Sequence, residues 1–105
     1  MIDLSSSELA IVKTILVKYV PDREVWAFGS RVTGKARPTS DLDIAVMGKT
    51  KLNRNALVLM KEEFEESTLP FTVDILDWNS ISEDFQKHIL ADHSVLQFPG
   101  NAKKD

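Results

Sequence analysis

Apolar residues recur at two spacings along this chain, and the wider spacing predicts three helices. The first begins at the capping-box pattern Ser-Ser-Ser-Glu of residues 5–8 and ends before Pro21. The second covers residues 53–67, and the third begins at a similar pattern in residues 80–83. The apolar stripes of the three helices are, in order, Leu9, Val12, Leu16 and Tyr19; Ala56, Met60 and Phe64; and Ile81, Phe85 and Ile89.

Shorter apolar segments with the two-residue period of strands lie between these helices. Residues 25–28, 42–47 and 71–76 predict three strands, and residues 95–98 predict a short edge strand. The order α-β-β-α-β-α, with this last strand, predicts one α+β (α/β) domain over residues 1–99. We expect a small mixed β-sheet flanked by helices, followed by a loose polar tail at residues 100–105.

Composition narrows the class of protein without identifying it. The 105 residues fit one domain, and the net charge of −3 predicts no strong binding to nucleic acid or to an anionic membrane. The absence of cysteine excludes disulfides and thiolate metal sites and fits a cytoplasmic location. No apolar run is long enough to span a bilayer, and the N-terminus does not resemble a signal peptide.

The predicted strand at residues 42–47 carries two aspartates in phase. Leu42, Ile44 and Val46 would share the core-facing side, so Asp41 and Asp43 would share the other. Two carboxylates this close repel each other unless a cation lies between them. The pair therefore suits Mg²⁺, which prefers oxygen ligands and substrate phosphates. Alone, an Asp-x-Asp sequence is more often a turn or helix cap.

A third aspartate lies on the next predicted strand. Asp74 is flanked by Val73 and Ile75, which would face the core, so its carboxylate lies on the opposite face. If this strand pairs beside the preceding one, Asp74 completes a cluster of three carboxylates. Such a cluster can hold two metal ions for an in-line displacement at phosphorus. Asp74 alone could equally lie at a solvated strand edge.

The loop before the aspartates has features of a phosphate-binding turn. Gly29 lets the backbone approach a ligand, and Ser30 donates from its hydroxyl and its amide. If residues 30–34 begin a short helix, its free N–H groups would point at phosphates. Arg31, Lys35 and Arg37 could add positive charge, or could simply form a solvated basic loop.

These residues together resemble a known family. The pattern Gly29-Ser30-x10-Asp41-x-Asp43, with Asp74 on a later strand, resembles the DNA polymerase β-type nucleotidyltransferase superfamily. The run from residue 28 to residue 46 is similar to its minimal nucleotidyltransferase (MNT) branch, and the similarity covers most of the chain. Thr33 stands where many members have a second arginine, which reduces the positive charge expected beside the phosphates.

The resemblance implies two Mg²⁺ ions and ATP or another nucleoside triphosphate as substrate. An acceptor hydroxyl would attack the α-phosphorus, and pyrophosphate would leave. The catalytic residues and metal ligands would be Asp41, Asp43 and Asp74, and the nucleotide- and phosphate-binding residues would be Gly29, Ser30, Arg31 and Ser40.

The resemblance also implies a partner protein. Minimal members are commonly encoded with a HEPN-domain protein, which implies an antitoxin that adenylylates a HEPN ribonuclease toxin. The short chain leaves little room for an acceptor-binding domain, so we expect the acceptor on a separate chain. A binding module that neutralises a HEPN partner by complex formation is the main alternative, and transfer to a small molecule such as an aminoglycoside is the weaker one. Homo- and hetero-oligomers both stay open.

Other conspicuous residues are predicted to be structural. Trp26 is expected in the core with Phe28, whereas Trp78 could pack under the last helix or face a partner. His88 and His93 lack the i, i+4 spacing of a helical metal pair and are predicted to be surface or cap residues. The acidic run at residues 62–66 reads as a solvated helix face or a surface for a basic partner.

Overall fold

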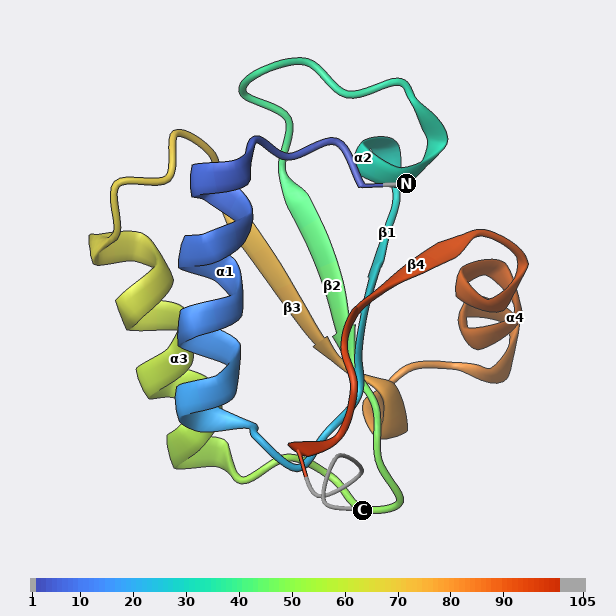
Figure 1. The fold of residues 1–105 in the computed structure, drawn as a ribbon. Helices are drawn as coiled ribbons and strands as arrows, with labels where there is room; N and C mark the ends of the chain where they lie inside the picture. The colour runs from blue at the N-terminus through green and yellow to red at the C-terminus, as the bar shows by residue number, and fades with distance from the viewer. Residues whose placement is uncertain (1, 101–105) are drawn as a thin grey trace.

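Four helices and a four-stranded sheet make up the part of the protein that the computed structural model describes, residues 2–100 (Figure 1). The α-helices are α1 (Ser6–Tyr19), α2 (Ser30–Thr33), α3 (Arg54–Glu66) and α4 (Glu83–Ala91). The strands are β1 (Val25–Phe28), β2 (Leu42–Val46), β3 (Val73–Asp77) and β4 (His93–Gln97). A 3₁₀ turn, η1 (Trp78–Ser80), joins β3 to the loop before α4.

The helix starts follow the capping chemistry of the sequence, with one exception. At α1 the Ser5 hydroxyl accepts from the Glu8 amide at 3.1 Å and the Glu8 carboxylate accepts from the Ser5 amide at 2.9 Å, which confirms the capping box. The prediction that the last helix begins at Ser80 is wrong, because Ser82 is the N-cap of α4. Residues 78–80 instead form η1, where the Asp77 carboxylate accepts from the Asn79 amide.

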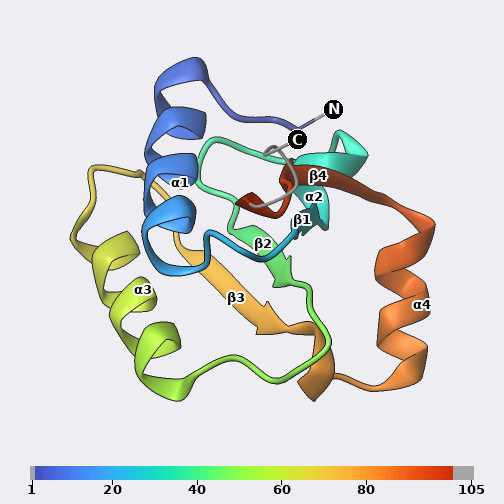
Figure 2. The ribbon, with the colours of Figure 1, turned by 60° about the horizontal axis from the view of Figure 1, so that its bottom comes forward.

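The sheet is mixed, as predicted, with strand order β3-β2-β1-β4 (Figure 2). β1 is antiparallel to β2 and to β4, whereas β2 and β3 are parallel and are connected through α3. The last strand is an edge strand, but it begins at His93 instead of residue 95. β3 begins at Val73, two residues later than predicted, and Phe71 lies in the segment before it.

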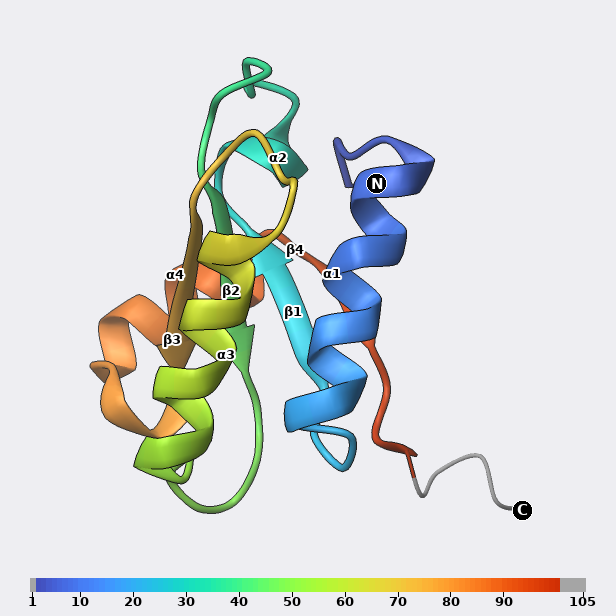
Figure 3. The same ribbon diagram turned by 90° about the vertical axis from the view of Figure 1, so that its left-hand side faces the viewer.

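The two faces of the sheet bury different clusters of side chains. α1 and α3 cover one face, and α4 lies on the other (Figures 2 and 3). The first cluster is aliphatic and includes the fully buried Val12, Leu16, Leu42, Ile44 and Met60. The second is smaller and rich in aromatic residues; it consists of Phe28, Ala45 and Ile89, with Trp26, Met47, Leu76, Trp78, Ile81 and Phe85 packed against it.

Aromatic stacking under α4 decides the positions of the histidines and tryptophans. The His93 ring stacks on Trp26 with centroids 3.8 Å apart, and Trp78 meets Trp26 edge-to-face at 5.5 Å. The prediction of a surface or cap role for His93 is wrong, because β4 starts at this residue and turns its ring against the sheet. His88 is exposed on α4, as predicted, and Trp78 packs under that helix.

The C-terminal end of the described region is attached to the α1–β1 turn. The Gly100 amide donates to the Pro21 carbonyl at 2.6 Å, so this residue is held at the protein surface. The rest of the predicted loose tail, residues 101–105, lies outside the described residues. No helix of the described chain is long and apolar enough to cross a membrane.

Candidate active site

The turn between β1 and α2 approaches a carboxylate so closely that it requires glycine. Gly29 has φ +81°, and a Cβ atom built on it would lie 2.5 Å from Oδ2 of Asp43. Any side chain here would therefore meet both backbone strain and a direct clash. Because Gly29 follows β1 directly, and Phe28 pairs with Asp43 in the sheet, the turn and the carboxylate are fixed to each other.

Parallel pairing brings the predicted aspartates to one face. In the β2–β3 ladder Asp43 and Asp74 are directly paired, so both side chains lie on the same side of the sheet. Asp41 immediately precedes β2. Asp41 and Asp74 are exposed, whereas Asp43 is half-buried beneath Gly29. The pairing that the triad required is therefore present.

The charge on Asp43 is poorly compensated by the protein itself. Burial, followed by the negative charges of Asp74 and Asp41, raises the pKa of Asp43 from 3.8 to about 6. The ion pair found among residues 2–100, Lys18–Glu63, lies between α1 and α3 on the other side of the sheet. Within residues 2–100, the site is thus a concentration of negative charge whose carboxylates form no ion pair.

The chemistry of these donors fits Mg²⁺, which binds carboxylate oxygens and phosphates. Within the described residues, no three Asp, Glu or His side chains are already drawn together as a metal cage. Asp74 and Asp41 are nonetheless close enough to Asp43 for their negative charges to add to burial in raising its pKa. Asp41 and Asp74 are exposed, and within residues 2–100 their carboxylates make no side-chain hydrogen bond or ion pair, so we interpret the cluster as an open site.

A single helical turn follows Gly29, where the sequence predicted a short helix. The amides of Val32 and Thr33 both donate to the Gly29 carbonyl, at 3.0 and 3.1 Å, and close the turn α2. Ser30 and Arg31 are the first residues of α2, whose amides have no acceptor within the helix. The Ser30 hydroxyl and these two amides therefore lie beside the point where the Gly29 backbone approaches the Asp43 carboxylate.

The structure gives Arg31 and Ser40 supporting contacts inside the loop. Arg31 is only 4% exposed, and its guanidinium donates to backbone carbonyls, Ser40 among them. The Ser40 hydroxyl accepts from the Arg37 amide at 2.8 Å. The sequence grouped both residues with the phosphate-binding set, but here they order the loop. In contrast, the side chains of Lys35 and Arg37 are exposed.

The N-terminal segment contacts this site, which the sequence analysis did not predict. The Asp3 amide donates to the Arg31 carbonyl at 2.7 Å, and the Asp3 carbonyl accepts from the Arg31 side chain at 2.8 Å. Asp3 makes both contacts with its backbone, so the identity of the residue at position 3 does not reveal them.

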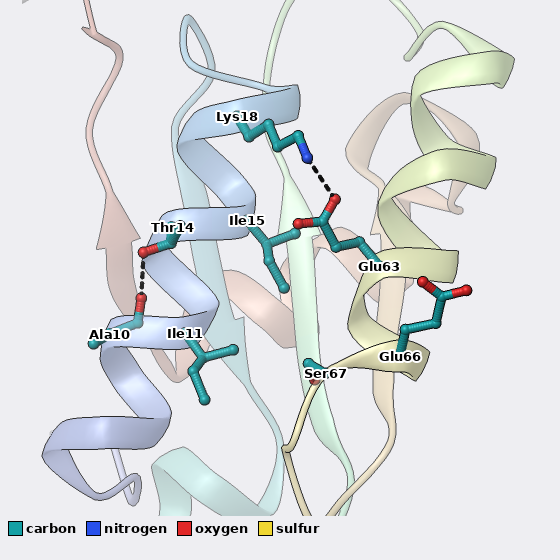
Figure 4. Close-up of a pocket in the computed structure, with 8 residues that line it drawn as sticks. All are labelled: Ala10, Ile11, Thr14, Ile15, Lys18, Glu63, Glu66 and Ser67. Atoms are coloured by element: carbon teal, nitrogen blue, oxygen red, sulfur yellow. Dashed lines mark hydrogen bonds and ion pairs between the residues drawn. The ribbon is translucent and has the colours of Figure 1, made fainter.

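One cavity beside the sheet reaches the triad at Asp74, and a larger groove beside α3 does not. A cavity of about 360 Å³ between α3 and β3 is lined by Lys61, Phe71 and Asp74 among others. A larger groove of about 580 Å³ lies between α1 and α3, where Lys18 and Glu63 pair across it (Figure 4). This groove contains none of the predicted site residues.

A mixed sheet that presents Asp41, Asp43 and Asp74 beside a glycine turn and a helix start defines the catalytic domain of a nucleotidyltransferase. Residues 11–97 match the family described as "Polymerase beta, Nucleotidyltransferase", and the chain belongs to this family. The family predicted from the sequence motif is therefore confirmed, as is the fold class.

Curated and solved relatives give more detail. The chain is 53% identical over 96 residues to the "Probable protein adenylyltransferase MntA" of Haemophilus influenzae, a match that covers 91% of this chain and 84% of the relative. A crystal structure of a toxin–antitoxin with AMP-PNP aligns at TM-score 0.72 and 22% identity, covering 90% of this chain and 76% of that one.

A tri-AMPylated Shewanella oneidensis HEPN toxin in complex with an MNT antitoxin aligns at TM-score 0.66 and 20% identity, covering 91% and 74% of the two chains. At these identities, the two solved structures show a shared fold.

Proposed function

We propose that this protein transfers AMP from ATP to a hydroxyl group of a HEPN-domain partner and acts as the antitoxin of that pair. The observation that carries the proposal is the register of β2 and β3, which pairs Asp43 with Asp74 beside Gly29. The 53% identity to a probable protein adenylyltransferase supports AMP as the transferred group and a protein as the acceptor. The cytoplasmic location predicted from composition belongs to the same proposal.

Each triad residue has a separate task in this proposal. Asp41 and Asp43 would hold Mg²⁺ beside the triphosphate, while Asp74 would hold a second Mg²⁺ and face the acceptor hydroxyl. Bound Mg²⁺ would supply charge neutralisation and lower the pKa of oxygens that it contacts. The raised pKa of Asp43, caused by burial and then by the charges of Asp74 and Asp41, supports this assignment, because a cation would offset both effects.

The phosphates would lie against the β1–α2 turn. Gly29 keeps the space above Asp43 open, and Ser30 offers a hydroxyl and an amide at the start of α2. Lys35 and Arg37 are the exposed cationic side chains of the adjoining loop and are placed to attract a polyanion. The acceptor oxygen forms a new bond to the α-phosphorus as the bond to pyrophosphate breaks. The proton of the acceptor hydroxyl passes to a carboxylate of the triad.

The test is AMP transfer to a co-purified HEPN-domain partner, followed by intact mass. With ATP and Mg²⁺ we expect the partner to gain the mass of AMP. Asp41→Asn and Asp43→Asn should each abolish the gain without lowering thermal stability. Glu62→Gln, a change of an exposed carboxylate on α3, is the matched control and should transfer normally. Full transfer by the Asp41→Asn, Asp43→Asn double variant would overturn the proposal.

Neutralisation by complex formation is separated from catalysis in the same preparations. The ribonuclease activity of the partner is measured with unmodified protein and with the double variant. Equal inhibition by both would assign the antitoxin effect to the complex and would contradict the role proposed for AMP transfer.

A further inference from the structure

The side chain of Arg31 joins separate chain segments around the acid cluster. Its Nε donates to the Ser40 carbonyl at 2.9 Å, and its Nη1 donates to the Asp3 carbonyl at 2.8 Å. Its Nη2 donates to the carbonyls of Pro38 at 2.9 Å and Arg37 at 3.3 Å. A single buried guanidinium thus connects the N-terminal segment, α2 and the loop that leads to Asp41 and Asp43.

A stacking contact extends this connection toward β3. The guanidinium carbon of Arg31 lies 4.1 Å from the centre of the Phe71 ring, in the segment that leads to β3. In the next residue, the Thr72 carbonyl accepts from the Leu42 amide at 2.9 Å. Arg31 therefore contacts the lead-in segments of both strands that carry the triad.

These contacts leave Arg31 little capacity to bind a phosphate. Four hydrogen bonds to carbonyls occupy four of the five N–H groups of the guanidinium. The side chain is also 4% exposed, so a triphosphate could reach it only if the loop opened. The exposed Lys35 and Arg37 have no such restriction.

We propose that Arg31 is a positioning residue for nucleotidyl transfer. This positioning role rests on the proposed function of the site and adds to that function. By holding the carbonyls of residues 37, 38 and 40, Arg31 sets the path of the chain into Asp41 and Asp43. Residues 33–35 and 37–39 are exposed. Ser40 closes a local turn with Arg37 through its hydroxyl and its amide, and Arg31 ties this turn to α2 and to the N-terminal segment.

A lysine cannot replace Arg31 in this role. The guanidinium is a planar fork that donates in several fixed directions, whereas an ammonium group is a compact point charge. Arg31→Lys keeps the positive charge but cannot reach carbonyls in both the N-terminal segment and the loop. If only the positive charge of residue 31 matters, Arg31→Lys should bind nucleotide normally. If positioning of the loop matters, Arg31→Lys should bind nucleotide weakly.

The experiment compares Arg31→Lys and Arg31→Met with two controls. Lys49→Met removes an exposed positive charge from the turn after β2, at the end of that strand opposite Asp41, and Val12→Ala destabilises α1 away from the site. For each protein we measure hydrogen exchange over residues 35–42, binding of AMP-PNP with Mg²⁺, and AMP transfer. Exchange needs no activity, so it reports on Arg31 independently of the proposed function.

Both Arg31 variants should exchange faster over residues 35–42 and bind AMP-PNP at least about tenfold more weakly, the usual effect of losing a residue that orients ligands. Lys49→Met and Val12→Ala should bind AMP-PNP as the unmodified protein does. Binding by Arg31→Lys equal to that of the unmodified protein would overturn the proposal. An equal loss in Lys49→Met or Val12→Ala would also overturn it, because net charge or global stability would then explain the effect.

A milder variant keeps the test decisive if the Arg31 variants do not fold. Phe71→Leu removes the stacked ring and leaves the four carbonyl contacts, so it should accelerate exchange over residues 35–42 by a smaller factor. Unchanged exchange there would count against the proposal. If the unmodified protein transfers no AMP while exchange and AMP-PNP binding behave as stated, the transfer is refuted and the role of Arg31 is supported.

Discussion

Removing the charge of Asp43 should stabilise the metal-free protein. The folded protein raises the pKa of this carboxyl to about 6, against 3.8 for an unperturbed group. Between these pH values the unfolded chain loses the proton and the folded protein keeps it. The stabilisation associated with the protonated form is therefore fully present below pH 4 and is lost as the pH rises through 6.

The magnitude follows from the shift and from the exposure of the side chain. A shift of this size corresponds to about 3 kcal/mol for a group sealed from water. Asp43 is half-buried, so screening by solvent reduces the expected effect to about 1–2 kcal/mol. At pH 7.5 in EDTA, Asp43→Asn should unfold at higher urea concentration than the unmodified protein by this free energy.

The assay is urea unfolding at several pH values with and without Mg²⁺. The advantage of Asp43→Asn should shrink as the pH falls toward 4, and it should reverse in saturating Mg²⁺, which stabilises only the protein that binds it. Glu62→Gln, whose carboxylate is exposed on α3, should show neither effect. If Asp43→Asn is the less stable protein at pH 7.5 in EDTA, then the acid cluster is not repulsive and the reasoning fails.

Three further changes test other parts of the site and the fold. Gly29→Ala should lower the unfolding free energy by about 1–3 kcal/mol and abolish AMP-PNP binding in calorimetry, because of its positive φ and the clash with Asp43; normal binding by this variant would contradict the close approach. Asp74→Asn should reduce the initial rate of AMP transfer by at least about 100-fold while AMP-PNP binding changes little, and parallel losses of both would argue against an acceptor-side role. Ser5→Ala should lower the unfolding free energy by about 1 kcal/mol in urea with transfer intact; no change would mean that the capping box does not stabilise α1.

Local patterns predicted the elements that hold the triad. The alternation around Asp43 and Asp74 predicted both strands and the face that each carboxylate occupies, because one side of each strand is apolar. The Ser-x-x-Glu pattern predicted the start of α1 for the same kind of local reason. Where a residue and its partner are a few positions apart, the sequence contains the whole interaction.

Contacts between distant segments were the ones that sequence reasoning missed. The carbonyl acceptors of Arg31 have no sequence signal, because any residue supplies a backbone carbonyl. The sequence predicts a surface or cap role for His93 because the residue that stacks on its ring, Trp26, lies on a strand far away in sequence. The Ser-Ile-Ser-Glu pattern predicts a helix start at Ser80 because it does not reveal the η1 turn, after which Ser82 is the N-cap.

The direct pairing of Asp43 with Asp74 has a consequence for folding as well as for chemistry. The two residues lie on parallel strands that α3 connects, and a slip of one residue would turn Asp74 to the opposite face. A cation that requires both carboxylates can bind only chains in which β3 has the correct register. Metal binding would thus select the correctly assembled sheet, and nucleotide turnover would be confined to molecules that had passed this folding checkpoint.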